Sequence, residues 1–241
     1  LEPDAGTIAL NLGEITGLPY STESTRLRWF GGTTNHWEGM CAPLGTNDFK
    51  KRDWIAHSGW PIELSDLQPF YAKAAQFLNL SGTQSHDFGI TPDLLEYPGD
   101  LAFGAWRFAA NLSLGSVYRA PLEQAKNIRI IFNANANNVL LDAAATTLSH
   151  VRAATLAGQR FSVHAKQYVL ACGGIENARL LLACNSQMPQ GIGNSYDQVG
   201  RYFMEHPHND IGKFYAFGES TLVKKIRLHF KNIRGLKPTN E

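Results

Sequence analysis

Residues 30–41 carry a dense set of chemically useful side chains, in the order Phe-Gly-Gly-Thr-Thr-Asn-His-Trp-Glu-Gly-Met-Cys. Two adjacent glycines, Gly31 and Gly32, allow positive φ and let a ligand approach bare backbone. Short donors and acceptors follow them, and then an ionisable ring and a large flat ring: Thr33, Thr34, Asn35, His36 and Trp37. This order predicts a site for a cofactor that carries phosphates and an aromatic ring system. The alternative is a glycine turn that leads into a buried aromatic strand.

A second glycine pair follows Cys172, where Gly173 and Gly174 separate two predicted elements. The apolar run 168–172 predicts a short buried strand, and the run 175–182 predicts a helix. Backbone amides at the start of a helix can bind an anion, so this turn is a second candidate for cofactor contact. A tight strand-to-helix turn with glycine for close packing remains the alternative.

The dinucleotide fingerprint Gly-x-Gly-x-x-Gly is not found after any predicted strand. Gly191 and Gly193 follow Pro189 without a third glycine, which predicts a loop. A complete dinucleotide-binding domain carries the fingerprint in its first strand-turn-helix unit. Either the protein binds no dinucleotide, or the fingerprint lies upstream of Leu1, and we expect the second.

Composition limits the class of protein. With 241 residues, of which 44% are hydrophobic, the chain can bury the core of one large domain or two small ones. Its 22 basic and 21 acidic residues leave a net charge of +1, which does not indicate nucleic-acid binding. No apolar stretch has the length of a membrane span. Three cysteines without a C-x-x-C pair argue against a disulfide framework or zinc site and favour a reducing, cytoplasmic compartment.

Helical spacing predicts one further helix, from Ser65 to about residue 79. Ser65 and Gln68 form a capping-box pattern, and Pro69 lies in the expected first turn. The following stretch, 81–120, is rich in Gly, Pro, Asp and Ser and is expected to be mostly irregular, with a short helix from Leu101.

Alternating apolar residues predict strands in the second half of the chain. A strand is expected over 128–132, with 138–141 as its continuation or partner. Residues 151–156 and 161–165, joined by a turn at Ala157-Gly158, are typical of a hairpin.

The run 205–210, Glu-His-Pro-His-Asn-Asp, has residue types that bind metals. Pro207 prevents a helical pair of ligands, and His206 and His208 would face opposite sides of an extended segment. A polar connection is therefore expected here, and we predict no metal site.

Four motifs in sequence order resemble the glucose-methanol-choline (GMC) oxidoreductases, a family of FAD-dependent alcohol oxidases and dehydrogenases. They are Gly-Gly-Thr-Thr-Asn-His-Trp at 31–37, Ser-Gly-Trp-Pro at 58–61, Ala-Cys-Gly-Gly-Ile-Glu-Asn-Ala-Arg-Leu-Leu at 171–181, and Val-Gly-Arg-Tyr-Phe-Met-Glu-His-Pro at 199–207. The resemblance covers about residues 26–210 and corresponds to the middle portion of a family member.

The resemblance implies positions for the cofactor. The glycine pair and the residues up to Trp37 would pack against the flavin and pyrophosphate of FAD, and Val139 would pass the adenine through its backbone. Cys172, Gly173 and Gly174 would touch the dinucleotide. The family's amino-terminal ADP-binding motif and carboxy-terminal histidine base are absent. The main catalytic base is therefore expected beyond Glu241, the catalytic residues remain unknown, and the fragment alone is expected to be inactive.

His36 also resembles a residue of the pyranose oxidase-like branch of this family. There a glycine pair is followed by Thr-His-Trp, and the histidine is bonded covalently to the flavin. Here the order is Asn35-His36-Trp37. The resemblance places His36 at the flavin edge, either as a covalent ligand or as a hydrogen-bonding neighbour.

The fold implied is an α/β FAD-binding domain, Rossmann-like and of the glutathione-reductase type, interleaved with parts of an α+β substrate domain. The FAD-binding portion is expected over 1–60 and 121–205, and the substrate portion over 61–120 and 206–241. The implied reaction oxidises the CH–OH group of a small alcohol or sugar: a base takes the hydroxyl proton while a hydride passes to flavin N5. Oxygen, a quinone or a haem protein would accept the electrons.

Two other functions remain open. The chain is a truncated, non-catalytic remnant of a flavin fold if no catalytic segment accompanies it. A nicotinamide-dependent dehydrogenase is the nearest alternative enzyme.

Overall fold

The computed structural model describes residues 4–17, 20–80, 107–109 and 113–205. The chain divides into two compact units, one formed by 1–125 with 213–241 and the other by 126–212. The domain boundaries inferred from the family stay a prediction.

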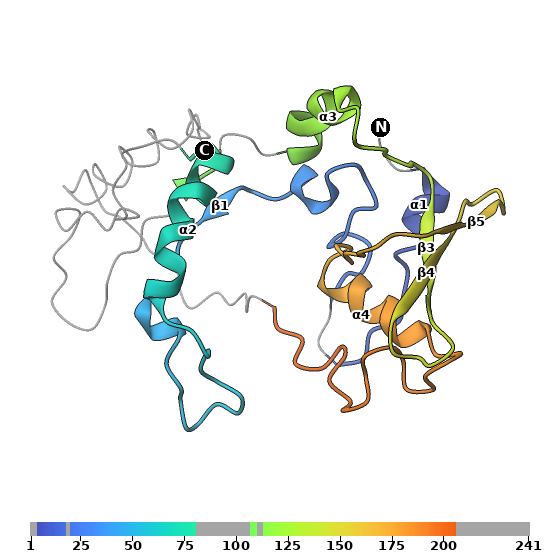
Figure 1. Cartoon of the computed structure of the whole chain (residues 1–241). Helices are drawn as coiled ribbons and strands as arrows, with labels where there is room; N and C mark the ends of the chain where they lie inside the picture. The colour runs from blue at the N-terminus through green and yellow to red at the C-terminus, as the bar shows by residue number, and fades with distance from the viewer. Residues whose placement is uncertain (1–3, 18–19, 81–106, 110–112, 206–241) are drawn as a thin grey trace, which may run out of the picture. The chain divides into compact units, whose positions relative to one another are not determined.

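Two helices of ordinary length and several short elements make up the described part of the first unit (Figure 1). In chain order they are α1 (Ala5–Ala9), η1 (Gly32–Asn35), β1 (Met40–Cys41), η2 (Thr46–Asp48), α2 (Leu64–Phe77), β2 (Arg107–Phe108) and α3 (Leu114–Gln124). The strands β1 and β2 pair antiparallel, with Met40 opposite Phe108. The Phe77 ring of α2 stacks on Tyr118 of α3 at a centroid distance of 5.4 Å.

The helix predicted from Ser65 is confirmed as α2, but its cap differs from the prediction. The helix begins one residue earlier, at Leu64, and Glu63 is its N-cap. The Asp66 carboxylate accepts a hydrogen bond of 2.8 Å from the Glu63 backbone N–H. A carboxylate in the first turn also interacts favourably with the helix dipole, so Glu63 and Asp66 replace the expected Ser65 and Gln68 pair.

Helix α3 was not expected, because 81–120 was predicted to be irregular. Ser113 caps it by accepting a bond of 3.2 Å from the Ser116 N–H. Gly115 and Pro121 lie inside the helix and disfavour helix formation, so the sequence pattern does not predict a helix here. The short helix predicted from Leu101 begins outside the described residues.

The described part of the second unit contains a three-stranded antiparallel sheet in the order β3-β4-β5 and one helix (Figure 1). Its elements are β3 (Asn135–Leu141), β4 (Leu148–Ala154), β5 (Arg160–Val163) and α4 (Gly174–Ala183). The predicted hairpin is confirmed as β4 and β5, and the predicted helix as α4. Residues 138–141 are a partner strand of this hairpin. The loop at Gly191 is also confirmed.

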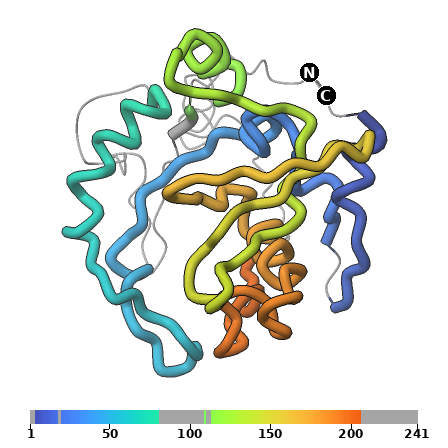
Figure 2. Tube along the Cα trace, turned by 45° about the vertical axis from the view of Figure 1, so that its right-hand side comes forward, coloured from blue at the N-terminus to red at the C-terminus, as the bar shows by residue number. Residues whose placement is uncertain are grey.

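The core of this unit lies where α4 packs against β3 (Figure 2). Val139, Leu180 and Cys184 are each at most 3% exposed. Partly buried apolar side chains surround them: Leu148, Val151, Leu170 and Ile192. The Cys184 thiol also accepts a hydrogen bond of 3.1 Å from the Val139 backbone N–H. The helix and the edge strand are therefore joined by both apolar burial and a polar contact.

Two strand predictions were wrong for the described residues. Neither 128–132 nor 168–172 joins a ladder there. Ile128, Ile131 and Phe132 are about half exposed, and Val169 is 87% exposed. Apolar alternation alone does not make a strand, because a strand also needs a partner for its backbone groups. The structure is mixed helix and sheet, and the Rossmann-like parallel sheet stays a prediction.

Candidate functional site

The first candidate segment begins with a left-handed turn at Gly31 and Gly32. Their φ values are 93° and 56°, a region in which glycine is favoured. The Gly32 N–H donates to the Trp29 carbonyl at 2.8 Å, and η1 follows at once. The glycine pair therefore forms the predicted turn, and it leads into a short 3-10 helix rather than into a strand.

Close packing of two backbone segments explains why residue 31 is a glycine. A Cβ at Gly31 would lie 2.5 Å from the backbone nitrogen of Gly115 in α3. A Cβ at Gly115 would in turn collide with the Phe30 carbonyl. Helix α3 thus approaches the turn so closely that both positions must lack a side chain.

Thr34 and Asn35 hold the same contact with their side chains. The Thr34 hydroxyl donates to the Gly31 carbonyl at 2.5 Å and accepts from the Leu114 N–H at 3.2 Å. The Asn35 amide donates to the Phe30 and Gly32 carbonyls at 3.0 and 2.9 Å. Its oxygen accepts from the Ser113 hydroxyl at 2.6 Å. These polar groups therefore stabilise the turn and the start of α3.

Sequence reasoning missed the α3 residues that complete this arrangement. Ser113 lies 78 positions beyond Asn35, so no local pattern joins the two. The local sequence Ser-x-Gly at 113–115 looks like that of any other helix N-cap, so it does not indicate the contact with Asn35.

Other positions in this segment are open to a ligand. A Cβ at Gly32 would meet nothing within 4 Å. Thr33 and His36 are exposed, and Trp37 is half-buried. The open positions therefore present bare backbone, a hydroxyl, an imidazole and an indole on one short stretch.

The second candidate segment is the start of α4. Gly173 has φ 88° and ψ 162°, a conformation essentially restricted to glycine. Gly174 is the first residue of the helix and has no such restriction. A Cβ at either position would meet nothing within 4 Å. The helix therefore begins with exposed, bare backbone whose first amides have no intrahelical acceptor.

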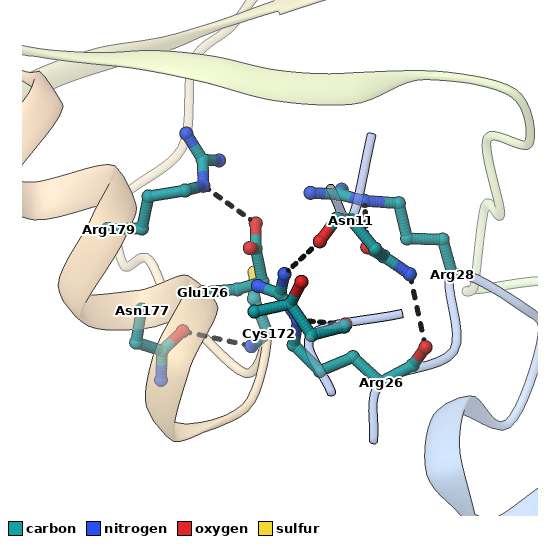
Figure 3. Close-up of polar contacts among 8 residues, drawn as sticks. Asn11, Arg26, Arg28, Cys172, Glu176, Asn177 and Arg179 are labelled. Carbon is teal, nitrogen blue, oxygen red and sulfur yellow. Dashed lines mark hydrogen bonds and ion pairs between the residues drawn. The ribbon is translucent and has the colours of Figure 1, made fainter. Parts of the chain in front are cut away.

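Asn177 fixes the chain that enters α4 (Figure 3). Its side-chain oxygen accepts from the Cys172 N–H at 2.9 Å, and its side-chain nitrogen donates to the Leu170 carbonyl at 3.1 Å. These two bonds hold 170–172 extended without a strand partner. The conformation of the Gly173-Gly174 turn is thus set before any ligand binds.

Glu176 places a negative charge in the first turn of α4. The residue is 7% exposed, and its carboxylate accepts a bond of 2.9 Å from the Arg179 guanidinium (Figure 3). A carboxylate there stabilises the helix and opposes a second anion. The start of α4 therefore fits an uncharged part of a dinucleotide better than its phosphates.

Val139 is buried at 2% exposure in the middle of β3. Because its backbone N–H already donates to Cys184, a ligand here has to use the carbonyl or a neighbouring residue. Cys172 is exposed. The structure thus groups Val139, Cys172, Gly173 and Gly174 in one unit, and the segment 31–37 belongs to the other.

The described residues offer no alternative metal centre, because no three His, Cys, Asp or Glu side chains there lie together. His206 and His208 fall outside the described residues. Burial raises the pKa of the Cys41 thiol, which disfavours a reactive thiolate. No described helix is long and apolar enough to cross a membrane.

Comparison with known proteins relates the chain to one family. Residues 111–208 match the family model described as GMC oxidoreductase. The large subunit of fructose dehydrogenase from Gluconobacter japonicus is 26% identical, over 75% of this chain and 41% of the relative. The chain therefore spans less than half the length of that relative. Together these matches confirm the resemblance to the GMC oxidoreductases, and the family-model match contains α3 and all of β3, β4, β5 and α4.

Proposed function

From this GMC resemblance, we propose that the chain forms part of the cofactor-binding region of an FAD-dependent oxidoreductase. One observation carries the proposal: inside the matched residues, the N-cap and the first residue of α4 are both glycines, and a Cβ at either position would face open space. A helix start without side chains suits a ligand that lies against main chain.

The residue types in the two candidate segments are suited to binding FAD. Gly32 and Gly174 leave room that the packing of the protein does not require. Thr33, His36 and Trp37 add a hydroxyl, an imidazole and a flat ring of the types that contact a flavin dinucleotide. Bound FAD supplies a two-electron acceptor for the hydride of a carbinol carbon. The chain's own contribution is to bind and orient it, and we assign no catalytic base to the described residues.

The substrate we propose is a small alcohol or sugar that is oxidised at a CH–OH group. The relative from Gluconobacter japonicus is named a fructose dehydrogenase, so fructose is the first compound to test. Sorbitol and glucose, which also carry CH–OH groups, complete a first panel.

Anaerobic mixing of the purified full-length protein with this panel tests the proposal. Loss of the oxidised flavin absorbance on addition of one compound supports an FAD-dependent oxidoreductase. Turnover that requires added NAD or NADP, without a flavin spectrum, identifies the nicotinamide-dependent alternative. Bound flavin that no panel member reduces, together with a reading frame that lacks any further segment, identifies the remnant.

We also propose that His36 lies at the flavin edge. Two observations support this placement: His36 is exposed, and Gly32, four residues earlier, has open space beside it. The covalent form of the proposal predicts that flavin stays with the protein after acid precipitation and is released from the His36→Ala variant. Flavin in the supernatant of the unmodified protein contradicts the covalent bond and leaves the hydrogen-bonded form.

A further inference from the structure

The sheet of the second unit has two different faces. Val139 and Val151 point to the face that packs against α4. The register places Asn138 opposite Arg152, and Arg152 opposite Ser162, on the other face. Since alternate residues of a strand share a face, Arg160 joins Ser162 there. This second face therefore brings one amide, one hydroxyl and two guanidinium groups together.

A cavity of about 510 Å³ is lined by these residues. Its lining is Asn137, Asn138, Arg152, Ala153, Arg160, Phe161 and Ser162. Asn137 lies at the irregularity between Ala136 and Asn138, where the register of β3 against β4 shifts. Such a bulge redirects a side chain and is often found beside binding sites. No acidic residue belongs to the lining, so its formal charge is positive.

The polar groups of this lining lack partners within the described part of the chain. The Asn138 side-chain oxygen is buried and accepts no hydrogen bond there. Arg152 and Arg160 have no carboxylate partner among the described residues, in contrast to Arg119, Arg179 and Arg201, each of which forms an ion pair. A buried acceptor without a donor costs free energy unless a ligand satisfies it.

We propose that this cavity binds the phosphate group of a small molecule, at a site separate from the flavin site. Two guanidinium groups on adjacent strands suit a phosphate, to which arginine can donate two parallel hydrogen bonds. The Asn138 oxygen requires a donor, which a protonated phosphate oxygen or an amino group of the same ligand provides.

The volume and the position of the cavity further restrict the class of ligand that it can bind. A volume of about 510 Å³ exceeds that of one phosphate and lies in the range of small-molecule sites. A buried amide oxygen among the lining residues is also more typical of a site for a small ligand than of a docking surface for an acidic protein. Helix α4, whose start is the candidate flavin contact, packs on the opposite face of the sheet.

Calorimetric titration of the full-length protein, saturated with FAD and held at constant ionic strength, tests the proposal. Inorganic phosphate and AMP are expected to bind at one site per chain, and adenosine is not. Tighter binding of AMP than of phosphate indicates a nucleotide-like ligand, whereas equal binding indicates free phosphate as the ligand. Both results support phosphate recognition.

Variants locate the binding in the cavity. Arg152→Gln and Arg160→Gln are each expected to weaken AMP binding by on the order of tenfold, the effect of losing a charge-assisted hydrogen bond. Arg129→Gln removes the same charge from an exposed position outside the lining and should leave binding unchanged. Asn138→Leu should weaken binding without lowering the Tm of the ligand-free protein, because it replaces an unpaired buried acceptor with an apolar group of similar size.

Several results would overturn the proposal. These are no phosphate or AMP binding, an equal loss in Arg129→Gln, and binding of phosphate only when FAD is absent. Preferential binding of a poly-glutamate peptide would identify the cavity as part of a protein-docking surface instead. A lower Tm in ligand-free Asn138→Leu with unchanged AMP affinity would make Asn138 a structural residue and remove the amide from the site.

Discussion

At the scale of single residues, Gly31 and Gly32 are adjacent but have different requirements. A side chain at Gly31 would collide with the backbone of Gly115, whereas one at Gly32 would meet open space. Both have positive φ, which by itself costs an alanine roughly 1–2 kcal/mol. We therefore predict that Gly31→Ala lowers the free energy of unfolding by about 3 kcal/mol or more.

Gly32→Ala is the matched control and should lose only about 1 kcal/mol, the cost of its backbone conformation. Urea unfolding of both variants measures the difference. Equal losses would contradict the close approach of α3 to the turn. Reduced flavin content in Gly32→Ala, despite its small loss of stability, would support contact with the cofactor at this position.

Asp142 provides a prediction that depends on pH. Its carboxylate accepts hydrogen bonds from the Thr147 hydroxyl at 2.6 Å and the Thr146 N–H at 2.9 Å, in the turn between β3 and β4. These bonds lower the pKa of Asp142 to about 2. Because the folded-state pKa lies below the unfolded one, the stabilisation is complete above about pH 4 and is lost as the pH falls toward 2.

Asp142→Asn removes this charge and one acceptor. The variant should therefore have a lower Tm than the unmodified protein at pH 7, and the difference should become smaller below pH 4. Thermal unfolding across this pH range is the measurement. A difference that stays constant down to pH 3 would show that the carboxylate charge does not stabilise the turn.

At the scale of elements, the hydrogen bond between Ser113 and Asn35 is one of the contacts that join η1 to the start of α3. Ser113→Ala removes the cap and should cost about 1 kcal/mol. Asn35→Ala removes three hydrogen bonds of a partly buried amide and should cost about 2 kcal/mol or more. Because the two side chains bond each other, the double variant should lose less than the sum of the single losses. Additive losses in urea unfolding would contradict the contact.

The elements that the sequence predicted are those with a complete local pattern. α2 and α4 have apolar residues at helical spacing, and the β4–β5 hairpin has alternating residues around a glycine turn. α3 could not be found in this way because Gly115 and Pro121 interrupt it. The run 168–172 resembles a strand, yet the side chain of Asn177 takes the place of a strand partner, which no apolar pattern reveals.

The candidate site was predictable in part for the same reason. The two glycine turns have a local signature, and the structure forms both of them. The tertiary roles of Thr34 and Asn35 depend on residues of α3 far away in sequence. The cavity on β3, β4 and β5 has no motif at all, because side chains from three strands meet there only after the sheet has formed.

At the scale of the whole molecule, the proposed function requires that FAD lies against the bare start of α4. Gly174 is suited to a test because its backbone is helical and a Cβ there would meet nothing within 4 Å. Gly174→Ala should therefore leave the Tm of the FAD-free protein unchanged or slightly higher, since alanine favours a helix more than glycine does. Ala183→Gly, near the end of the same helix, is the control and should lower the Tm slightly while leaving FAD affinity unchanged.

The most direct measurement is equilibrium titration of the FAD-free, full-length protein with FAD, for the unmodified protein and for Gly174→Ala. We predict one FAD per chain, and an affinity that falls by on the order of tenfold in the variant, which corresponds to about 1.4 kcal/mol of lost contact. Absence of FAD binding by the unmodified protein, or equal affinity in the two proteins, would contradict the account.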